Sequence, residues 1–344
     1  MITDGQTTQP RTGRPMLSRR QSLKAAAGLG ALTIFGQRFA RGEKPVAQLP
    51  ALGNGNGFYQ RKIGTFDVAV ISDGTFPLAP PFPLFGANAS EKEVSDTLAE
   101  SFLRADRLTG HVNALLVRTG KETLLIDTGC GTNFGPTTGF LVRHLANLGV
   151  APSDINAVLI THAHPDHLGG LIDPAGQPVF SKAEVIFTKA EQAFWTDANP
   201  DLSKSGTPDA MKEMMVKGAQ SVLAAVTKQA RVVGSGDKLF DGIELVDAAG
   251  HTPGHVGVLI ASGSDQLLYV TDAVHAHQIQ FAHPDWFVAF DTDPNLAVTT
   301  RKKLLDRAAA DRLMIAGAHL PFPAFGHVRS SSGRYDWVPT IWEW

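Results

Sequence analysis

The sequence has one cysteine and no long apolar run, and each of these features excludes a class of protein. Cys130 is the only cysteine among 344 residues, so no disulfide can form within the chain. We interpret it as a small residue that fills a tight turn. The apolar run 25–36 has 12 residues, whereas a membrane-spanning helix needs about 20, and no other segment approaches that length. We therefore expect no stable membrane anchor.

Charge is distributed unevenly along the chain. The formal net charge is −2, but residues 1–44 carry eight Lys or Arg and two Asp or Glu. The remaining 300 residues carry 23 basic and 31 acidic side chains. A polyanion such as RNA requires a basic surface. An acidic body argues against a nucleic-acid partner.

The basic N-terminal stretch resembles a targeting segment. The run SRRQSLK at 18–24 is similar to the twin-arginine export signal, although Ser22 stands where a large apolar residue is usual. The apolar run 25–36 has the length of a signal's hydrophobic region. This pattern predicts a signal and its flank over residues 1–44, a mature domain over 45–344, and a periplasmic or secreted protein. A disordered basic tail is the alternative.

Strand-like and helix-like patterns follow one another through the rest of the chain. Apolar runs predict strands at 66–71 (ending in a turn at 72–74), 112–117, 123–126, 157–160, 183–187, 244–246, 256–260, 267–270 and 313–316. Helical spacing predicts helices at 140–148, 189–195, 210–228, and from the N-cap Asp293 and Pro294 to about 310. Two runs of strands with helices between them favour a layered α/β sandwich.

One loop carries an unusual density of metal ligands. The segment THAHPDHLGG at 161–170 holds three imidazoles and a carboxylate within six residues, directly after a buried strand. Alternate residues of an extended chain point the same way, so His162 and His164 can reach one ion. Asp166 and His167, after the bend at Pro165, can turn to a second. Imidazole and carboxylate together suit zinc, and also manganese, iron or cobalt.

Further candidate ligands stand where later strands give way to loops. They are His251 and His255 in the motif GHTPGH at 250–255, Asp272 after the strand 267–270, and His319 after the strand 313–316. Each alone is weak evidence, because a single histidine at a strand end is more often a capping or core residue. Together with the loop 161–170 they indicate a metal centre.

These motifs resemble the signature of the metallo-β-lactamase fold superfamily. Within it the chain is similar to methyl parathion hydrolases and their lactonase and arylesterase relatives, from about residue 57 to about 338. The resemblance implies an α/β fold, a metallo-β-lactamase-like four-layer αββα sandwich. It also implies two divalent metal ions, zinc first and manganese, cobalt or iron as alternatives, and it is compatible with a homodimer.

The resemblance also implies a role for each candidate residue. The first metal would be bound by His162, His164 and His251, the second by Asp166, His167 and His319, and Asp272 would bridge them. Asp127 and Thr161 would orient ligating imidazoles, and His255 would be a buried hydrogen-bonding residue. True β-lactamases typically carry Cys or Ser where this chain has Asp272.

The expected chemistry is two-metal hydrolysis. A divalent cation lowers the pKa of bound water to about 7, so a metal-bridging hydroxide needs no Ser or Cys nucleophile. Asp166 or Asp272 would accept a proton. His275 would polarise the substrate carbonyl or protonate the leaving group, with a supporting role for His275 and His277 as the alternative.

The substrate pocket is predicted from the resemblance and from local composition. Phe134, Trp195 and Met215 are candidate pocket residues, with core packing as the alternative for the two aromatics. The apolar stretch 77–85 predicts a lip over the metals, with a loop packed against the body of the protein as the alternative. Met214-Met215 replaces an expected aromatic and His275 an expected apolar residue, which favours a carboxylic ester over a phosphotriester.

The sequence therefore predicts a dinuclear metal-dependent hydrolase that cleaves a small-molecule lactone or aryl or carboxylic ester. An organophosphate triester hydrolase is the alternative. A metal-binding sensor without catalysis is a further one.

Overall fold

Two seven-stranded sheets form the centre of the protein. The structure, a computed structural model, describes residues 56–343, so the signal predicted for residues 1–44 lies outside the described part. The strand orders are β1-β2-β3-β4-β5-β6-β7 and β14-β13-β12-β11-β10-β9-β8. Each sheet thus uses one continuous half of the chain, as the two runs of predicted strands require.

The first sheet is mixed, with antiparallel strands in one half and parallel strands in the other. Its strands are β1 (Phe58–Ile63), β2 (Phe66–Leu78), β3 (Leu108–Arg118), β4 (Thr123–Ile126), β5 (Ala157–Leu159), β6 (Glu184–Thr188) and β7 (Ala230–Val233). The pairs from β1 to β4 are antiparallel, and those from β4 to β7 are parallel. The loops that follow β4, β5 and β6 therefore leave the same edge of the sheet.

The second sheet is antiparallel except for one pair. Its strands are β8 (Lys238–Phe240), β9 (Ile243–Asp247), β10 (Val256–Ser262), β11 (Asp265–Tyr269), β12 (Met314–Ala316), β13 (Gly326–Ser331) and β14 (Arg334–Pro339). Strands β11 and β12 are parallel, so the loops after them also leave one edge together.

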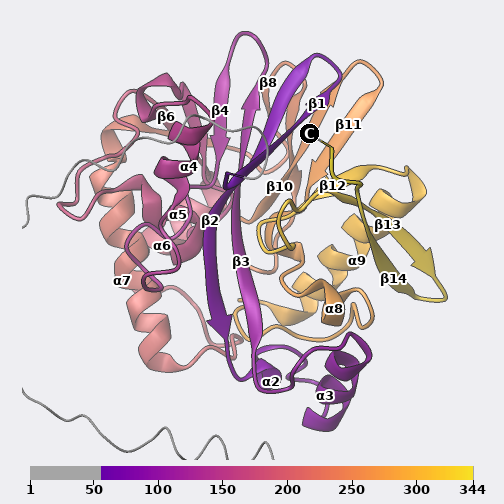
Figure 1. Cartoon of the computed structure of the whole chain (residues 1–344). Helices are drawn as coiled ribbons and strands as arrows, with labels where there is room; N and C mark the ends of the chain where they lie inside the picture. Colours follow the sequence, from indigo (N-terminus) through magenta and orange to yellow (C-terminus); the bar gives the residue numbers. More distant parts are fainter. Residues whose placement is uncertain (1–55, 344) are drawn as a thin grey trace, which may run out of the picture. The chain divides into compact units, whose positions relative to one another are not determined.

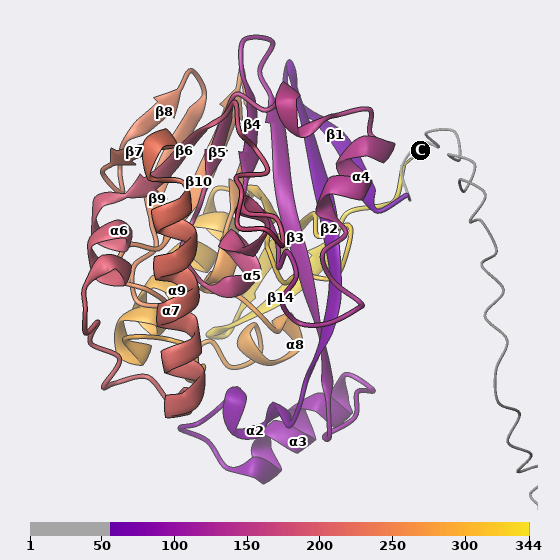
Figure 2. The same ribbon diagram turned by 90° about the vertical axis from the view of Figure 1, so that its left-hand side faces the viewer.

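Helices cover the outer faces of both sheets (Figures 1 and 2). On the first sheet lie α4 (Leu141–Asn147), α5 (Pro165–Leu168), α6 (Lys189–Thr196) and α7 (Asp209–Ala225), and on the second α9 (Pro294–Ala310). Figure 1 shows α5, α6 and α7 on one side of the strands and α9 on the other. The predicted αββα sandwich is confirmed.

The hydrophobic core explains this layering. Alternate residues of a strand face opposite sides, so Val70 packs between the sheets whereas Ile71 packs under the helices. The start of α9 follows its sequence signal, because Asp293 accepts a hydrogen bond from the backbone N–H of Leu296 (3.1 Å) and Pro294 occupies the first turn.

A small cap stands beyond the ends of β2 and β3 (Figure 2). It contains α2 (Pro81–Leu84), α3 (Glu91–Glu100) and α8 (His277–Gln280), which pack around buried residues such as Phe85, Leu98 and Ile279. None of these helices was predicted, because α2 and α8 have four residues each and α3 has only Val94 and Leu98 as large apolar residues. The cap supplies walls for the cavities described below.

The prediction that the strand starting at Phe66 ends in a turn at 72–74 is wrong. Strand β2 continues to Leu78, and its register with β3 shifts between Ser72 and Gly74. Gly74, at this bulge, has a φ of +127°, a backbone conformation that glycine adopts readily and other residues rarely adopt. Buried Asp73 accepts hydrogen bonds from the backbone of Cys130, Gly139 and Leu141.

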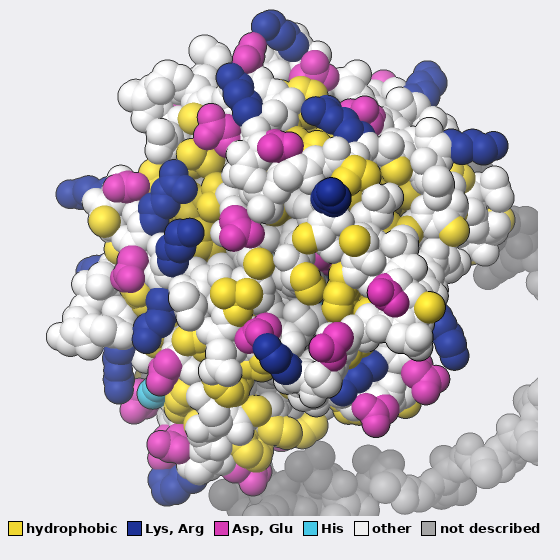
Figure 3. All heavy atoms as spheres, turned by 180° about the vertical axis from the view of Figure 1, so that it is seen from behind, with side chains coloured by type: hydrophobic (Ala, Val, Ile, Leu, Met, Phe, Trp, Pro, Cys, Tyr) yellow, Lys and Arg dark blue, Asp and Glu magenta, His cyan; other side chains and the backbone are white. Residues whose placement is uncertain are grey.

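The remaining predicted elements are present with shifts of a few residues, and the unpredicted strands are β1, β7, β8, β13 and β14. Across residues 56–343, the structure contains no helix long and apolar enough to cross a membrane. Cationic and anionic side chains are interspersed on the face seen in Figure 3.

Candidate metal centre

All seven predicted ligands converge at one edge of the two sheets. His162 and His164 follow β5, and Asp166 and His167 lie in α5. His251 follows β9, Asp272 lies in the short 3₁₀ turn Thr271–Ala273 after β11, and His319 follows β12. The strands end together, so residues up to 157 positions apart in the chain meet.

Three nitrogen atoms face one another in the first group. Nδ1 of His164 lies 3.1 Å from Nε2 of His162 and 2.9 Å from Nε2 of His251. The potential ligand atoms of these three residues all lie within 4.8 Å of one another. Such spacing lets one ion reach all three, as predicted for the first metal.

The second group contains Asp166, His167 and His319, whose ligand atoms also lie within 4.8 Å of one another. Asp272 stands between the groups. Its Oδ2 is 3.4 Å from Nε2 of His251 and 3.0 Å from Nε2 of His319, and its Oδ1 is 3.2 Å from Nε2 of His167. This position matches the bridging role that the resemblance implies.

The residues fit divalent metal ions. Nδ1–H of His167 can donate to Asp127 (2.8 Å) and that of His319 to the backbone carbonyl of His111 (2.6 Å), which leaves each Nε2 lone pair for a ligand bond. Nε2 of His167 and Oδ1 of Asp272 are buried with no hydrogen-bond partner in the described part of the chain. Buried polar atoms rarely lack partners, so a cation there satisfies them.

The electrostatics of the first group agree with this fit, whereas in the second group burial is outweighed by Asp272, which raises the pKa of His167 and His319. Burial, and then neighbouring histidines, holds the pKa of His162, His164 and His251 well below the usual range. Neutral imidazole is the form that binds metals. Burial raises the pKa of Asp272, but His167, His319 and His162 outweigh it and hold the pKa well below its usual range. A buried carboxylate that stays ionised requires cations beside it.

Asp127 and His255 have the positions predicted for them. Asp127 accepts hydrogen bonds from the backbone N–H of Thr161 (2.9 Å) and from its hydroxyl, and it holds His167. His255 is buried, contacts the carbonyl of Ala248 (2.8 Å) and the hydroxyl of Thr271, and joins none of the ligand groups found in residues 56–343. Burial lowers the pKa of His255 to about 4.

Two buried carboxylates of the site, those of Asp291 and Glu191, were not predicted from the sequence. Oδ1 of Asp291 lies 2.8 Å from Nδ1 of His251, so it fixes that ring as Asp127 fixes His167. Burial raises the pKa of Asp291 to about 6, although Arg301 opposes this shift. Only the loop packing before α9 brings Asp291 to His251, so no local pattern marks it.

Glu191 was missed for a different reason. It stands three residues after Thr188, whose hydroxyl accepts from the backbone N–H of Glu191 (3.2 Å) and caps α6. Thr followed by Glu at this spacing is typical of an exposed capping box, which offers a local explanation for the residue. In the structure Glu191 is fully buried and contacts the loops of both His162 and His251.

A cavity of about 560 Å³ opens over the ligand cluster. Its walls are mostly apolar. The apolar residues that line it are Phe76, Pro77, Leu78, Ala79, Pro80, Pro83, Leu84, Phe134, Pro165, Pro208, Met211, Met214, Met215, Ala289 and Phe290. The predicted lip at 77–85 therefore does line it. Phe134 is half-exposed and stacks on Phe76, with ring centroids 4.7 Å apart.

The structure separates the three predicted pocket residues. Phe134 and Met215 line the apolar cavity, whereas Trp195 is fully buried and does not line it. Trp195 donates from Nε1 to Glu191 (2.6 Å) and packs edge-on against His164, with ring centroids 5.6 Å apart. It supports a ligand from behind, so direct contact with substrate is not expected.

His275 stands at the metal cluster, lines the apolar cavity, and forms a further possible ligand group with His251 and Asp272. Its Nε2 is 3.1 Å from Oδ2 of Asp272 without hydrogen-bond geometry, and its ring stacks on His319 with centroids 5.2 Å apart. His277 lines only a second cavity of about 420 Å³. Burial, and then His111, lowers the pKa of His277 to about 4.

Cys130 is buried and free, and it belongs to none of the ligand groups in the described residues. Burial, and then nearby Asp166 and Asp73, raises the pKa of its thiol. It fills the turn after β4, as predicted.

Comparison with known proteins identifies the family. The family described as "Metallo-beta-lactamase superfamily" matches residues 107–319. The solved structure of AidC, a dizinc quorum-quenching lactonase in complex with the product N-hexanoyl-L-homoserine, is 30% identical with a TM-score of 0.79 and covers 83% of this chain and 98% of its own. The hydrolase AbOPH is 30% identical with a TM-score of 0.76, covering 86% and 99%.

Curated relatives match over shorter stretches. An N-acyl homoserine lactonase from Bacillus sp. is 24% identical over 188 residues, which is 54% of this chain and 61% of the lactonase. Metallo-beta-lactamase domain-containing protein 1 from Rattus norvegicus is 36% identical over 104 residues, 30% of this chain and 35% of the rat protein. The chain thus spans between about a third and three fifths of these two relatives.

Proposed function

We propose that this chain, which belongs to the metallo-β-lactamase superfamily, is a dinuclear metal-dependent hydrolase. Its substrates would be lactones or carboxylic esters with an apolar acyl group. One observation carries this proposal. Seven ligand side chains meet in two groups joined by Asp272, directly below a cavity with mostly apolar walls. The superfamily membership and the lactonase neighbours support the hydrolytic class.

The residues divide the chemistry among them. His162, His164 and His251 would hold one ion, Asp166, His167 and His319 the other, and Asp272 both. When bound, two divalent cations, zinc first, supply hydroxide at neutral pH and polarise the scissile carbonyl. Asp127 and Asp291 keep the ligating rings in one orientation through Nδ1–H.

Three side chains are placed to handle protons. The Asp166 carboxylate lines the cavity and is partly exposed, with its Oδ2 3.5 Å from Nε2 of His319, so it can accept a proton from the attacking group. Asp272, which is buried, is the second candidate for this role. Nε2 of His275 lacks a hydrogen bond in the described chain and can donate to the carbonyl or the leaving oxygen.

The apolar cavity narrows the substrate class. Burial of an acyl chain releases apolar surface from water, and each buried CH₂ contributes about 0.8 kcal/mol. AidC was solved with an N-hexanoyl-L-homoserine product, so an N-acyl homoserine lactone is our first candidate substrate. The aromatic pair Phe76 and Phe134 at the cavity wall favours one alternative, an organophosphate triester with an aryl leaving group.

The test compares these classes on metal-loaded protein. N-hexanoyl homoserine lactone, an aryl ester and an aryl phosphotriester are assayed before and after chelation, beside measurement of bound metal. We expect about two metals per chain, turnover of the lactone or ester above the phosphotriester, and loss of both metal and activity with Asp272→Ala. A two-metal sample that cleaves none of the three contradicts the proposal and favours a metal-binding sensor.

Export is a separate part of the proposal. The pair Arg19 and Arg20 and the apolar run after it support a twin-arginine route. This route carries folded proteins, which suits an enzyme that binds its metals before it crosses a membrane.

A further inference from the structure

A second cavity meets the apolar one at the metal centre. It has a volume of about 420 Å³ and shares only Leu78, His275 and His319 with the larger cavity. Its other walls come from the segment after α3, the start of β3 and the start of α8. A substrate held at the metals could therefore extend into both cavities.

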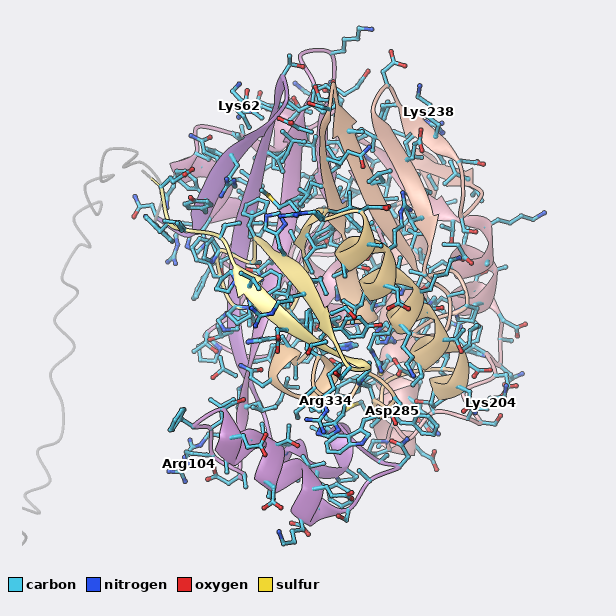
Figure 4. All side chains as sticks on the ribbon, turned by 90° about the vertical axis from the view of Figure 1, so that its right-hand side faces the viewer. Lys62, Arg104, Lys204, Lys238, Asp285 and Arg334 are labelled. Atoms are coloured by element: carbon cyan, nitrogen blue, oxygen red, sulfur yellow. The ribbon has the colours of Figure 1, made fainter. Side chains whose placement is uncertain are left out.

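The walls of the second cavity include two arginines, whereas those of the first, in the described part of the chain, contain no Lys or Arg. Arg104 and Arg107 line it, and no Asp or Glu among the described residues does. Figure 4 marks Arg104 at the cap formed by α2 and α3. Asp106 binds Arg104 through both oxygens (2.7 and 2.6 Å), but it is 3.8 Å from Nη2 of Arg107. One carboxylate thus faces two guanidinium groups, which leaves one positive charge in excess.

Two imidazoles add hydrogen-bonding capacity deeper in the cavity. His111 and His277 both line it and are half-buried. Neither ring forms a hydrogen bond with any part of residues 56–343, whereas the ring of neighbouring His319 binds the backbone carbonyl of His111. Half-buried polar groups usually find a partner in the protein, in water or in a ligand.

We propose that this second cavity is a subsite for a carboxylate on the substrate, remote from the bond that is cleaved. The acyl group would occupy the apolar cavity, the scissile carbonyl would lie at the metals, and the carboxylate would lie beside Arg107 and Arg104. Guanidinium groups match carboxylates in shape as well as charge. This inference rests on the proposed function and adds to it a preference for esters or lactones that carry a remote anionic group over uncharged ones.

Binding tests the subsite without any turnover. The probes are N-hexanoyl amides of straight-chain ω-amino acids of increasing length, each compared with its uncharged N-methylamide, by calorimetry on metal-loaded protein. At the best spacer length we expect the carboxylate to bind about two- to five-fold tighter than the methylamide, the range for partly exposed ion pairs. Added salt should reduce this preference.

Variants decide whether the arginines cause the preference. Arg104→Gln with Arg107→Gln should abolish it, and Asp106→Asn should increase it, because it removes the competing carboxylate. Arg329→Gln is the matched control. The side chain of Arg329 has the same exposed fraction as that of Arg104, 70%, and it too binds an aspartate, Asp336.

Each outcome decides one proposal. Equal binding of carboxylate and methylamide at every spacer length overturns the subsite. The subsite is also overturned if the Arg104→Gln, Arg107→Gln variant still binds the carboxylate more tightly than the uncharged probe. The metals themselves would then bind the carboxylate. Hydrolysis is measured separately on hexanoyl esters of the same spacers. If these esters are not cleaved although the amides bind as expected, the proposed function fails and the subsite stands.

Discussion

Glu191 joins the loop that carries His162 and His164 to the loop that carries His251, the three proposed ligands of one metal. Its Oε1 accepts from the backbone N–H of Ala163 (2.8 Å) and from Nε1 of Trp195 (2.6 Å), and its Oε2 from the hydroxyl of Thr252 (2.6 Å) and the backbone N–H of Gly254 (3.0 Å). Ala163 lies between His162 and His164, and Thr252 follows His251. Replacing Glu191 should therefore disturb metal binding from a residue that binds no metal.

The size of the effect follows from these four donors. In Glu191→Gln the amide NH₂ can face Thr252, whose hydroxyl can turn to accept, but Gly254 N–H is then left without a partner. One unsatisfied buried donor costs about 1–3 kcal/mol of unfolding free energy. Glu191→Ala removes all four bonds, and with water entering the space we expect roughly 3–5 kcal/mol.

The assay has two readouts. Urea unfolding of the metal-free variants gives the stability change, and competition with a chelator gives metal affinity, which we expect to fall about 10- to 100-fold. Glu213→Gln is the control, because the side chain of Glu213 is 72% exposed and should change stability by less than about 0.5 kcal/mol. A Glu191→Gln protein with wild-type stability and wild-type metal affinity would refute the reasoning.

Three further predictions concern the cavity, a buried carboxylate and export. Met215→Trp fills the apolar cavity, so kcat/KM should fall more for long acyl chains than for short ones across a substrate series; an equal loss at every length contradicts the assignment. Burial raises the pKa of Asp291 from 3.8 to about 6. The contribution of this carboxyl group to the unfolding free energy of the metal-free protein is therefore fully present below about pH 4 and is lost as the pH rises through 6. Relative to Asp291→Asn, unfolding free energy should thus fall by about 3 kcal/mol between pH 4 and 7, and a constant difference in urea titrations refutes this. Arg19→Lys with Arg20→Lys should retain the protein in the cytoplasm of a bacterial host that has the twin-arginine machinery, as fractionation would show; unchanged export argues against the signal.

Local patterns were enough for much of the fold. Strand β4 and helix α9 were predicted within a residue of their observed bounds, because an apolar run and a capped Pro start depend only on neighbouring residues. The turn after Ile71 was mispredicted for the same reason. Its Ser-Asp-Gly sequence is typical of turns, but β3 pairs across the bulge and keeps the strand extended.

The candidate metal ligands could be identified from a local pattern, because His162, His164, Asp166 and His167 lie within one loop. The side chains that support and surround them could not be identified in this way, because they come from distant parts of the chain. Asp291 reaches His251 across 40 residues, and Trp195 faces the core rather than substrate. Such contacts depend on how separate elements pack, and a buried carboxylate has the same local sequence as an exposed one.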